Sequence, residues 1–156
     1  MGNRNSQHNN TMGKLMTPET AINKLSKYKH LPRTKLPWLK NRQTLLDCAA
    51  AVSWVFGTKP EIISCGVWVD HFRARKTWFT KGIPKPGDLV IFDWTSGNGM
   101  GKNVNHDHIG IVITATKTLV TYVSADSTRP TPGLVTDNAV GYKYILGYGR
   151  PTYTNG

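Results

Sequence analysis

The stretch from Leu46 to Gly57 constrains the fold of this chain more than any other part of the sequence. Between Ala49 and Phe56 the only polar residue is Ser53, so the pattern predicts a helix that is apolar nearly all round and lies inside the domain. Asp47 is a suitable N-cap, and Gly57 supplies the left-handed residue at which helices commonly end. Other elements must cover a helix of this kind, and its three consecutive alanines would let the face of a sheet approach closely.

Cys48 falls in the first turn of this predicted helix. The helix dipole favours negative charge at that end, so the pKa of a thiol there falls and the thiolate becomes available as a nucleophile. A buried cysteine can also serve simply as a small core residue. The helix alone leaves both interpretations open, and other parts of the chain have to decide between them.

The length of 156 residues suffices for one domain with a sizeable core. The composition predicts a disordered polar tail over residues 1–16, a single domain over residues 17–151 and a short C-terminal tail over residues 152–156. No stretch approaches the roughly 20 apolar residues of a membrane span, and the N-terminus lacks the apolar segment of a signal peptide. We therefore expect a protein that is made in the cytoplasm and reaches an external target only after release.

The order of the predicted elements is typical of an α+β domain. A helix begins at Thr17 and Pro18, and another follows the buried helix over residues 64–75. Strands are predicted over residues 89–94, 108–113, 118–124 and 142–148, with an irregular stretch over residues 128–138. The sequence therefore predicts N-terminal helices packed on an antiparallel β-sheet.

The net charge of +11 predicts attraction to a polyanion, which could be nucleic acid, anionic lipid or a cell wall that bears phosphate and carboxylate polymers. Charge alone does not choose among these partners. The sequence has no RNA-binding motif and no repeat of aromatic and basic residues, which argues against nucleic acid. One alternative is a basic, non-catalytic protein that binds a cell wall or nucleic acid and in which Cys48 is merely buried.

A cysteine nucleophile needs a base beside it and a third group that orients the base. Among the five histidines, His108 is the best candidate for the base, because it begins a predicted strand and is followed closely by Gly110. Strand alternation places His108 on one face with Gly110 and Val112, and a glycine there leaves room for a substrate or another backbone. The thiol would meet the imidazole if the N-terminus of the cysteine helix lay across that face.

The orienting group is expected on the neighbouring strand. Ser124 and Asp126 point to the same side of that strand by alternation. Asp126 is the stronger candidate, because a carboxylate also stabilises the imidazolium, while Ser124 could assist with a hydrogen bond. An ordinary turn residue is the other interpretation of Asp126.

Metal-binding interpretations are weaker. His106, Asp107 and His108 could supply ligands together with Cys48, but the spacing fits no zinc pattern. Asp93 and Asn98 offer calcium only one carboxylate. The two cysteines form no CxxC pair. A bridge is possible if Cys48 is buried on one helix and Cys65 begins the next, but it is unnecessary, and we expect both cysteines to be reduced.

Five blocks of the chain, in this order, resemble those of the CHAP-type cysteine amidases and peptidases. They are Asp47–Phe56, Trp68–Phe72, Pro86–Trp94, Asp107–Val112 and Gly147–Pro151, the last being similar to a common ending of phage lysins. The resemblance covers about residues 17–151. It implies a papain-like fold of the CHAP/NlpC type and hydrolysis of amide bonds in peptidoglycan.

The resemblance also places the nucleophile at Cys48 and the base at His108. Many relatives carry a glutamate and, two residues later, an asparagine after the histidine strand, where this chain has Ser124 and Asp126. We therefore assign the orienting role to Asp126. The loop that binds calcium in some relatives is acidic, whereas residues 95–105 contain no acid here, so we expect no metal and no other cofactor.

Together these features predict a phage-type endolysin that acts on the bacterial cell wall after release from the host cytoplasm. The Cys48 thiolate would attack the carbonyl, and His108 would take the thiol proton and later protonate the leaving amine. The backbone N–H of Cys48, with Gln43 as a candidate side chain, would hold the oxyanion.

The positive charge would hold a monomeric enzyme on peptidoglycan and its anionic polymers. The sequence does not distinguish an N-acetylmuramoyl-L-alanine amidase from a peptidoglycan endopeptidase. A tail-associated lysin, or an enzyme with which a cell remodels its own wall, would use the same site.

Overall fold

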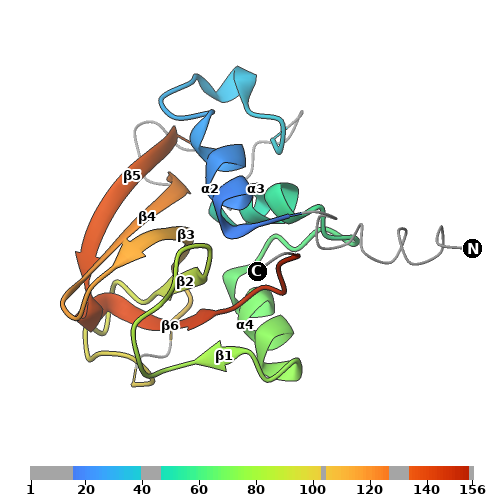
Figure 1. The fold of residues 1–156 in the computed structure, drawn as a ribbon. Coiled ribbons are helices and arrows are strands. Elements are labelled where there is room, and N and C mark those ends of the chain that lie inside the picture. The colour runs from blue at the N-terminus through green and yellow to red at the C-terminus, as the bar shows by residue number, and fades with distance from the viewer. Residues whose placement is uncertain (1–15, 40–46, 103–104, 127–133, 155–156) are drawn as a thin grey trace, which may run out of the picture.

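The structure is a computed structural model that describes residues 16–39, 47–102, 105–126 and 134–154. Within these residues, three α-helices lie beside one six-stranded antiparallel sheet, which confirms the expected α+β class (Figure 1). The strand order is β1-β6-β2-β3-β4-β5. The helices are α2 (Pro18–Ser26), α3 (Asp47–Phe56) and α4 (Cys65–Ala74), and the strands are β1 (Trp78–Phe79), β2 (Leu89–Phe92), β3 (His108–Ala115), β4 (Leu119–Asp126), β5 (Leu134–Gly141) and β6 (Ile145–Gly149).

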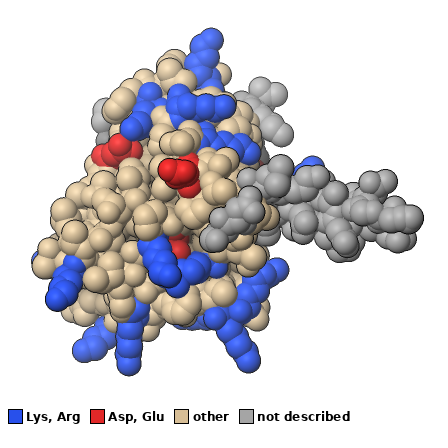
Figure 2. Space-filling view, in the orientation of Figure 1, with Lys and Arg blue, Asp and Glu red and all other residues tan. Residues whose placement is uncertain are grey.

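Basic side chains outnumber acidic ones on the face of the molecule drawn in Figure 2. In the face drawn in Figure 2, Lys and Arg gather at the upper end, over α2 and the turn that follows it, and again along the lower edge. Few acidic side chains interrupt them on this face. On this face the positive charge thus lies at two opposite ends of the molecule.

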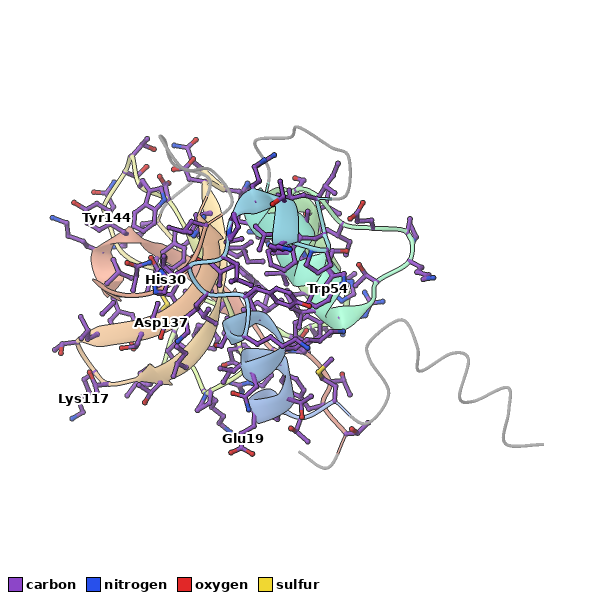
Figure 3. All side chains as sticks on the ribbon, turned by 90° about the horizontal axis from the view of Figure 1, so that it is seen from above. Glu19, His30, Trp54, Lys117, Asp137 and Tyr144 are labelled. Carbon is purple, nitrogen blue, oxygen red and sulfur yellow. The ribbon has the colours of Figure 1, made fainter. Side chains whose placement is uncertain are left out.

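Helix α3 lies in the centre of the molecule, as its apolar sequence predicts. Residues 48–53, Val55 and Phe56 are buried, while Trp54 is half-buried (Figure 3). The helix packs against β3 and β4 and against α2. Ser53, its one polar residue between Ala49 and Phe56, accepts a hydrogen bond from the N–H of Ile62 at 2.9 Å. Gly57 follows with a φ of 63°, which confirms the predicted left-handed end of the helix.

Side-chain caps fix the starts of the other two helices. The hydroxyl of Thr17 accepts a hydrogen bond from the N–H of Thr20 at 3.1 Å, and Pro18 occupies the first position of α2, as predicted. The hydroxyl of Ser64 accepts one from the N–H of Val67 at 3.4 Å. This second cap makes Cys65 the first residue of α4.

The prediction of an irregular stretch over residues 128–138 was wrong for its second half. Residues 134–141 form β5, an edge strand that pairs with β4 along its whole length. Only Val135 is fully buried, because the strand is covered on one face near its start and exposed over residues 137–139, so its sequence shows no apolar alternation. An ion pair of 2.8 Å joins Lys29, in the turn after α2, to Asp137 of this strand.

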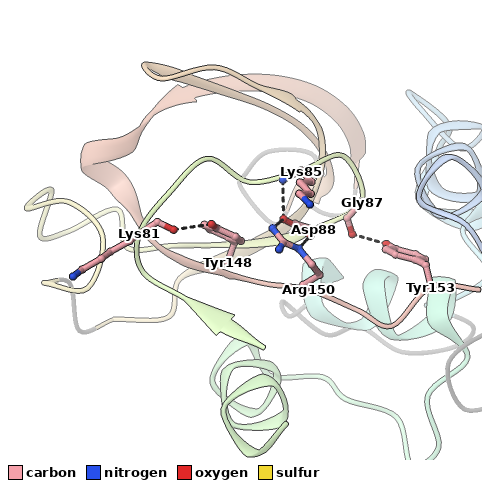
Figure 4. Close-up of polar contacts among 7 residues, drawn as sticks. All are labelled: Lys81, Lys85, Gly87, Asp88, Tyr148, Arg150 and Tyr153. Atoms are coloured by element: carbon pink, nitrogen blue, oxygen red, sulfur yellow. Dashed lines mark hydrogen bonds and ion pairs between the residues drawn. The ribbon is translucent and has the colours of Figure 1, made fainter. Parts of the chain in front are cut away.

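The C-terminal block is held to the turn before β2. The Arg150 guanidinium donates two hydrogen bonds to the buried Asp88 carboxylate, from Nε at 3.0 Å and from Nη2 at 2.9 Å (Figure 4). Tyr153 donates its hydroxyl proton to the carbonyl of Gly87. A side chain on Gly149 would collide with the ring of Phe72 on α4, so glycine is required there. These contacts fix β6 against β2 and α4.

No described helix combines the length and the apolar character that a membrane span requires. Met16 is part of the folded domain, because its side chain is buried and its carbonyl accepts a hydrogen bond from the N–H of Thr154 at 2.9 Å.

Candidate active site

The thiol of Cys48 lies where the first turn of α3 meets the start of β3. The side chain is 3% exposed. The His108 imidazole and the backbone N–H of Ile109 lie close enough to this thiol to lower its pKa. The structure thus brings together two groups that are 60 positions apart in the chain and that the sequence predicted to meet.

The two groups meet by a different route from the one predicted. Helix α3 packs on the face of β3 that carries Ile109 and Ile111, not on the face that carries Gly110 and Val112. The space beside Gly110 is filled by the Tyr122 ring, which would lie 2.6 Å from a Cβ atom added to Gly110. The thiol meets the imidazole at the N-terminal end of β3. His108 is the first residue of that strand, and the N-terminus of α3 lies beside it.

Ser124 on β4 holds the other side of the imidazole. Its Oγ lies 2.9 Å from Nε2 of His108, and both side chains are buried. Because Ser124 engages Nε2, the ring nitrogen that remains for the thiol is Nδ1. A neutral His108 that carries its proton on Nε2 donates it to Ser124 and leaves Nδ1 free to accept the thiol proton.

The structure describes only the backbone of two other predicted site residues and does not describe a third. Asp126 is the last residue of β4 and pairs with Leu134, and Asp47 is the first residue of α3, but both side chains lie outside the described part. Gln43 lies outside the described residues altogether. Their roles as orienting group, cap and oxyanion ligand remain predictions.

Cys65 is a neighbour of the site to which the sequence analysis gave no role there. Its Sγ lies 3.9 Å from Sγ of Cys48, and both cysteines are free thiols, as expected. The Ser64 cap signals that Cys65 begins a helix. No local pattern shows that the starts of two helices converge, because that depends on how α3 and α4 pack on the sheet.

The surroundings favour a thiolate on Cys48. The hydrogen bond between the Cys48 and Cys65 sulfurs, together with the His108 imidazole and the Ile109 N–H, holds the pKa of Cys48 well below its usual value despite burial. The same pairing, burial and the Asp107 carboxylate raise the pKa of Cys65. The pKa values of the two thiols therefore move in opposite directions.

An exposed aromatic ring borders the site. Trp94 is 41% exposed and stacks on the buried Phe92 ring with centroids 4.8 Å apart and an interplanar angle of 7°. Its ring centroid lies 6.1 Å from that of His108 and 5.9 Å from that of Tyr144. The Trp94 backbone N–H donates to the Asp107 carboxylate at 2.8 Å, which fixes the start of the loop that leads to His108.

His106 and His71 are not among the groups that shift the pKa of the Cys48 thiol. The His106 ring packs over Gly66, with Nδ1 3.4 Å from the position of an added Cβ. His71 on α4 lies edge-on against Trp68 and Phe72, and burial and the nearby Arg75 lower its pKa. His71 is thus a half-buried neighbour of the aromatic residues on α4.

In the described residues no group of three His, Cys, Asp or Glu side chains could hold a metal ion. Asp93 is surrounded by protein donors. Its carboxylate accepts hydrogen bonds from the N–H groups of Thr95, Ser96 and Asn105 and from the Thr95 hydroxyl. Burial opposes its charge, but these donors hold its pKa well below the usual range. Asp93 thus organises the loop after β2 rather than offering free oxygens.

A separate hollow of about 290 Å³ lies at the opposite end of α3, around Ser53, Trp54 and Gly57. None of the residues that line it belongs to the cysteine site.

Comparison with protein families matches residues 38–126, more than half of the chain, to the CHAP domain. The chain belongs to the CHAP family. No curated protein matches it. CHAP domains are generally amidohydrolases or peptidases that use a cysteine and a histidine, and membership implies a function of the peptidoglycan-hydrolase type. The CHAP match contains Cys48, Cys65, His108 and Ser124, and the α+β architecture agrees with a papain-like fold.

Proposed function

We propose that this CHAP protein is a phage-type endolysin that hydrolyses an amide bond of peptidoglycan through Cys48. The observation that carries the proposal is a buried thiol at the start of α3 whose pKa is lowered by a buried imidazole, with Nε2 of that imidazole 2.9 Å from Ser124 Oγ. A thiolate, a base and a group that fixes the base are what acyl transfer by a cysteine requires.

In the proposed mechanism, the Cys48 thiolate attacks the carbonyl carbon of the scissile amide. The backbone N–H of Cys48, at the positive end of the α3 dipole, holds the oxyanion, with Gln43 as a candidate second donor. His108 gives its proton to the departing amine, and an acyl-enzyme forms on the sulfur. His108 then takes a proton from a water molecule that attacks the thioester, which frees the acid and restores Cys48.

Ser124 and Asp126 are the candidates for the group that orients His108. The 2.9 Å contact between Ser124 Oγ and Nε2 supports Ser124 as a direct partner. Asp126, two residues further along β4, would add a negative charge that stabilises the imidazolium. We propose that the serine fixes the ring and that the aspartate supports the charge.

Two surface features favour peptidoglycan as the partner. The exposed face of Trp94 beside His108 gives a flat apolar surface on which a sugar ring or an apolar part of the stem peptide can lie. The charge of +11 holds the protein on a wall rich in phosphate and carboxylate groups. On this account a monomer suffices, and no metal, nucleic acid or membrane span takes part.

The test is digestion of purified peptidoglycan by the full chain, with Cys48→Ala as the blank. Mass spectrometry of the fragments is expected to show one new kind of end. A free lactyl carboxylate on the muramic acid identifies an amidase, and a new amino-terminal residue within the stem or cross-bridge identifies an endopeptidase. Digestion is expected to continue in EDTA. Abolition by EDTA with rescue by calcium or zinc would contradict the metal-free mechanism.

A basic, non-catalytic wall- or nucleic-acid-binding protein is the alternative that the net charge favours. It predicts that Cys48→Ala and treatment with iodoacetamide leave both wall binding and biological effect intact. Binding to nucleic acid would in addition weaken steeply with salt. Loss of wall cleavage with retained wall binding in Cys48→Ala would exclude this alternative.

A further inference from the structure

The second cysteine of the chain lies against the proposed nucleophile. The Sγ atoms of Cys48 and Cys65 are 3.9 Å apart, which is hydrogen-bonding distance for two sulfurs. The residues are 3% and 7% exposed, so little water competes for this contact. Cys65 takes no part in the mechanism proposed above.

Two helix starts bring the thiols together. Cys48 is in the first turn of α3, and Cys65 is the first residue of α4 behind the Ser64 cap. Helix dipoles favour negative charge at their N-termini, so the sulfur pair lies where two such dipoles support one thiolate. Two adjacent thiolates would repel each other, so only one thiol can lose its proton.

The charged and titratable groups around the pair decide which thiol ionises. The groups that face Cys48 are the His108 imidazole on β3 and the Cys65 thiol on α4, together with the Ile109 N–H. Cys65 faces Cys48 and the negative Asp107. A carboxylate opposes charge on Cys65, and an imidazole favours charge on Cys48, so Cys65 keeps its proton.

We propose that Cys65 is a positioning residue of the active site, whose S–H donates a hydrogen bond to the Cys48 thiolate and holds that sulfur charged and correctly aimed beside His108. The inference depends on the nucleophilic role proposed for Cys48. A thiol is a weak donor, but a hydrogen bond to a charged acceptor inside a protein is stronger than one between neutral groups.

A hydrogen bond from Cys65 has two opposite effects on the reactivity of the Cys48 sulfur. A donor that stabilises the thiolate increases the fraction of Cys48 that is ionised at a given pH. It also makes the sulfur less nucleophilic, by a factor of roughly three for each unit by which the pKa falls. Cys65 therefore extends activity toward acidic pH at some expense of the maximal rate. A cysteine that merely fills space in the core would do neither.

The experiment measures the alkylation of Cys48 by iodoacetamide from about pH 4 to about pH 9, in the full chain and without peptidoglycan. Peptide mass spectrometry follows Cys48 separately from Cys65. We compare the wild type with Cys65→Ala, which removes the donor, and with Cys65→Ser, which replaces the S–H by an O–H. The absence of wall material makes the result independent of whether peptidoglycan is the substrate.

In Cys65→Ala, the midpoint of the alkylation profile is expected to move about one to two pH units higher, as loss of a hydrogen bond to a charged group predicts. The rate at the alkaline plateau is expected to rise a few-fold. Cys65→Ser is expected to keep most of the wild-type midpoint. An unchanged midpoint in Cys65→Ala, or an equal shift in both variants, would overturn the proposal.

A measurement on the wild type covers the case in which Cys65→Ala does not fold. With ¹³C at the cysteine Cβ atoms, the chain gives two cysteine signals. One is expected to titrate well below the range of an ordinary cysteine and the other to stay protonated up to about pH 9. Two signals that both titrate in the ordinary range would overturn the proposal. If the low midpoint is found but peptidoglycan is not cleaved, the thiol pairing stands and the proposed function falls.

Discussion

Oγ of Ser124 on β4 lies 2.9 Å from Nε2 of His108 on the neighbouring strand β3, and both groups are shielded from solvent. The contact fixes which ring nitrogen faces Cys48. It therefore links the register of two strands to the protonation state of the proposed base.

Replacement of Ser124 by Ala removes this contact and lets the imidazole rotate. We expect kcat to fall at least about tenfold with KM little changed, because general acid–base catalysis contributes roughly a hundredfold or more and depends on the position of the base. Thr121→Ala, on the same strand but away from His108, is the matched control. If Asp126→Asn lowers kcat more than Ser124→Ala does, the aspartate and not the serine is the main orienting group.

Replacement of Trp94 by Ala removes the exposed ring beside His108. We expect KM for soluble peptidoglycan fragments to rise roughly two- to tenfold, which corresponds to one aromatic contact. The rate at which iodoacetamide alkylates Cys48 should stay unchanged, since that reagent needs no aromatic platform. Ile83→Ala removes another exposed apolar side chain and should change neither quantity. An unchanged KM in Trp94→Ala would show that the substrate does not lie on this ring.

Replacement of Arg150 by Met leaves the buried Asp88 carboxylate without its cation. We expect the free energy of unfolding to fall by about 3 kcal/mol, as when one partner of a buried ion pair is removed. Arg150→Lys should lose less, because it keeps the charge but not the two-pronged geometry. Denaturant unfolding measures the effect. Lys85→Met, at a residue whose hydrogen bonds with Asp88 run through the backbone, is the control that should unfold like the wild type.

His71 is expected to make the fold sensitive to mild acid. Burial lowers its pKa in the folded state, so the unfolded chain binds a proton more readily, and stability falls as the pH drops through the unfolded value near 6.5. The thermal midpoint of the wild type should therefore decrease between about pH 7 and about pH 5. His71→Gln should decrease less over the same interval. Parallel curves for the two proteins would show that His71 titrates alike in both states.

The elements around the cysteine could be predicted because their signals are local. The apolar run from Ala49 to Phe56 requires a buried helix, and Thr17 with Pro18 marks the start of α2. Strand β5 could not be predicted, because its exposed residues, such as Asp137 and Asn138, are typical of loops and the strand forms only by pairing with β4.

The chemical groups of the site were also predictable, but their arrangement was not. The position of Cys48 at a helix start and of His108 at a strand start can be read from the chain. That α3 covers the Ile109 face, so that the two groups meet around the end of β3, depends on the packing of the whole core. The contact of Cys65 with Cys48 depends in the same way on the placement of α4.

The central claim is that the sulfur of Cys48 carries out the cleavage. It is tested most directly by treating the full chain with increasing amounts of iodoacetamide and measuring, in each sample, both the alkylated fraction of Cys48 and the remaining rate of peptidoglycan cleavage. We expect activity to fall in proportion to the unmodified Cys48 and to be absent from Cys48→Ala, while both proteins still sediment with the wall. Full cleavage by Cys48→Ala, or by a fully alkylated sample, would contradict the account.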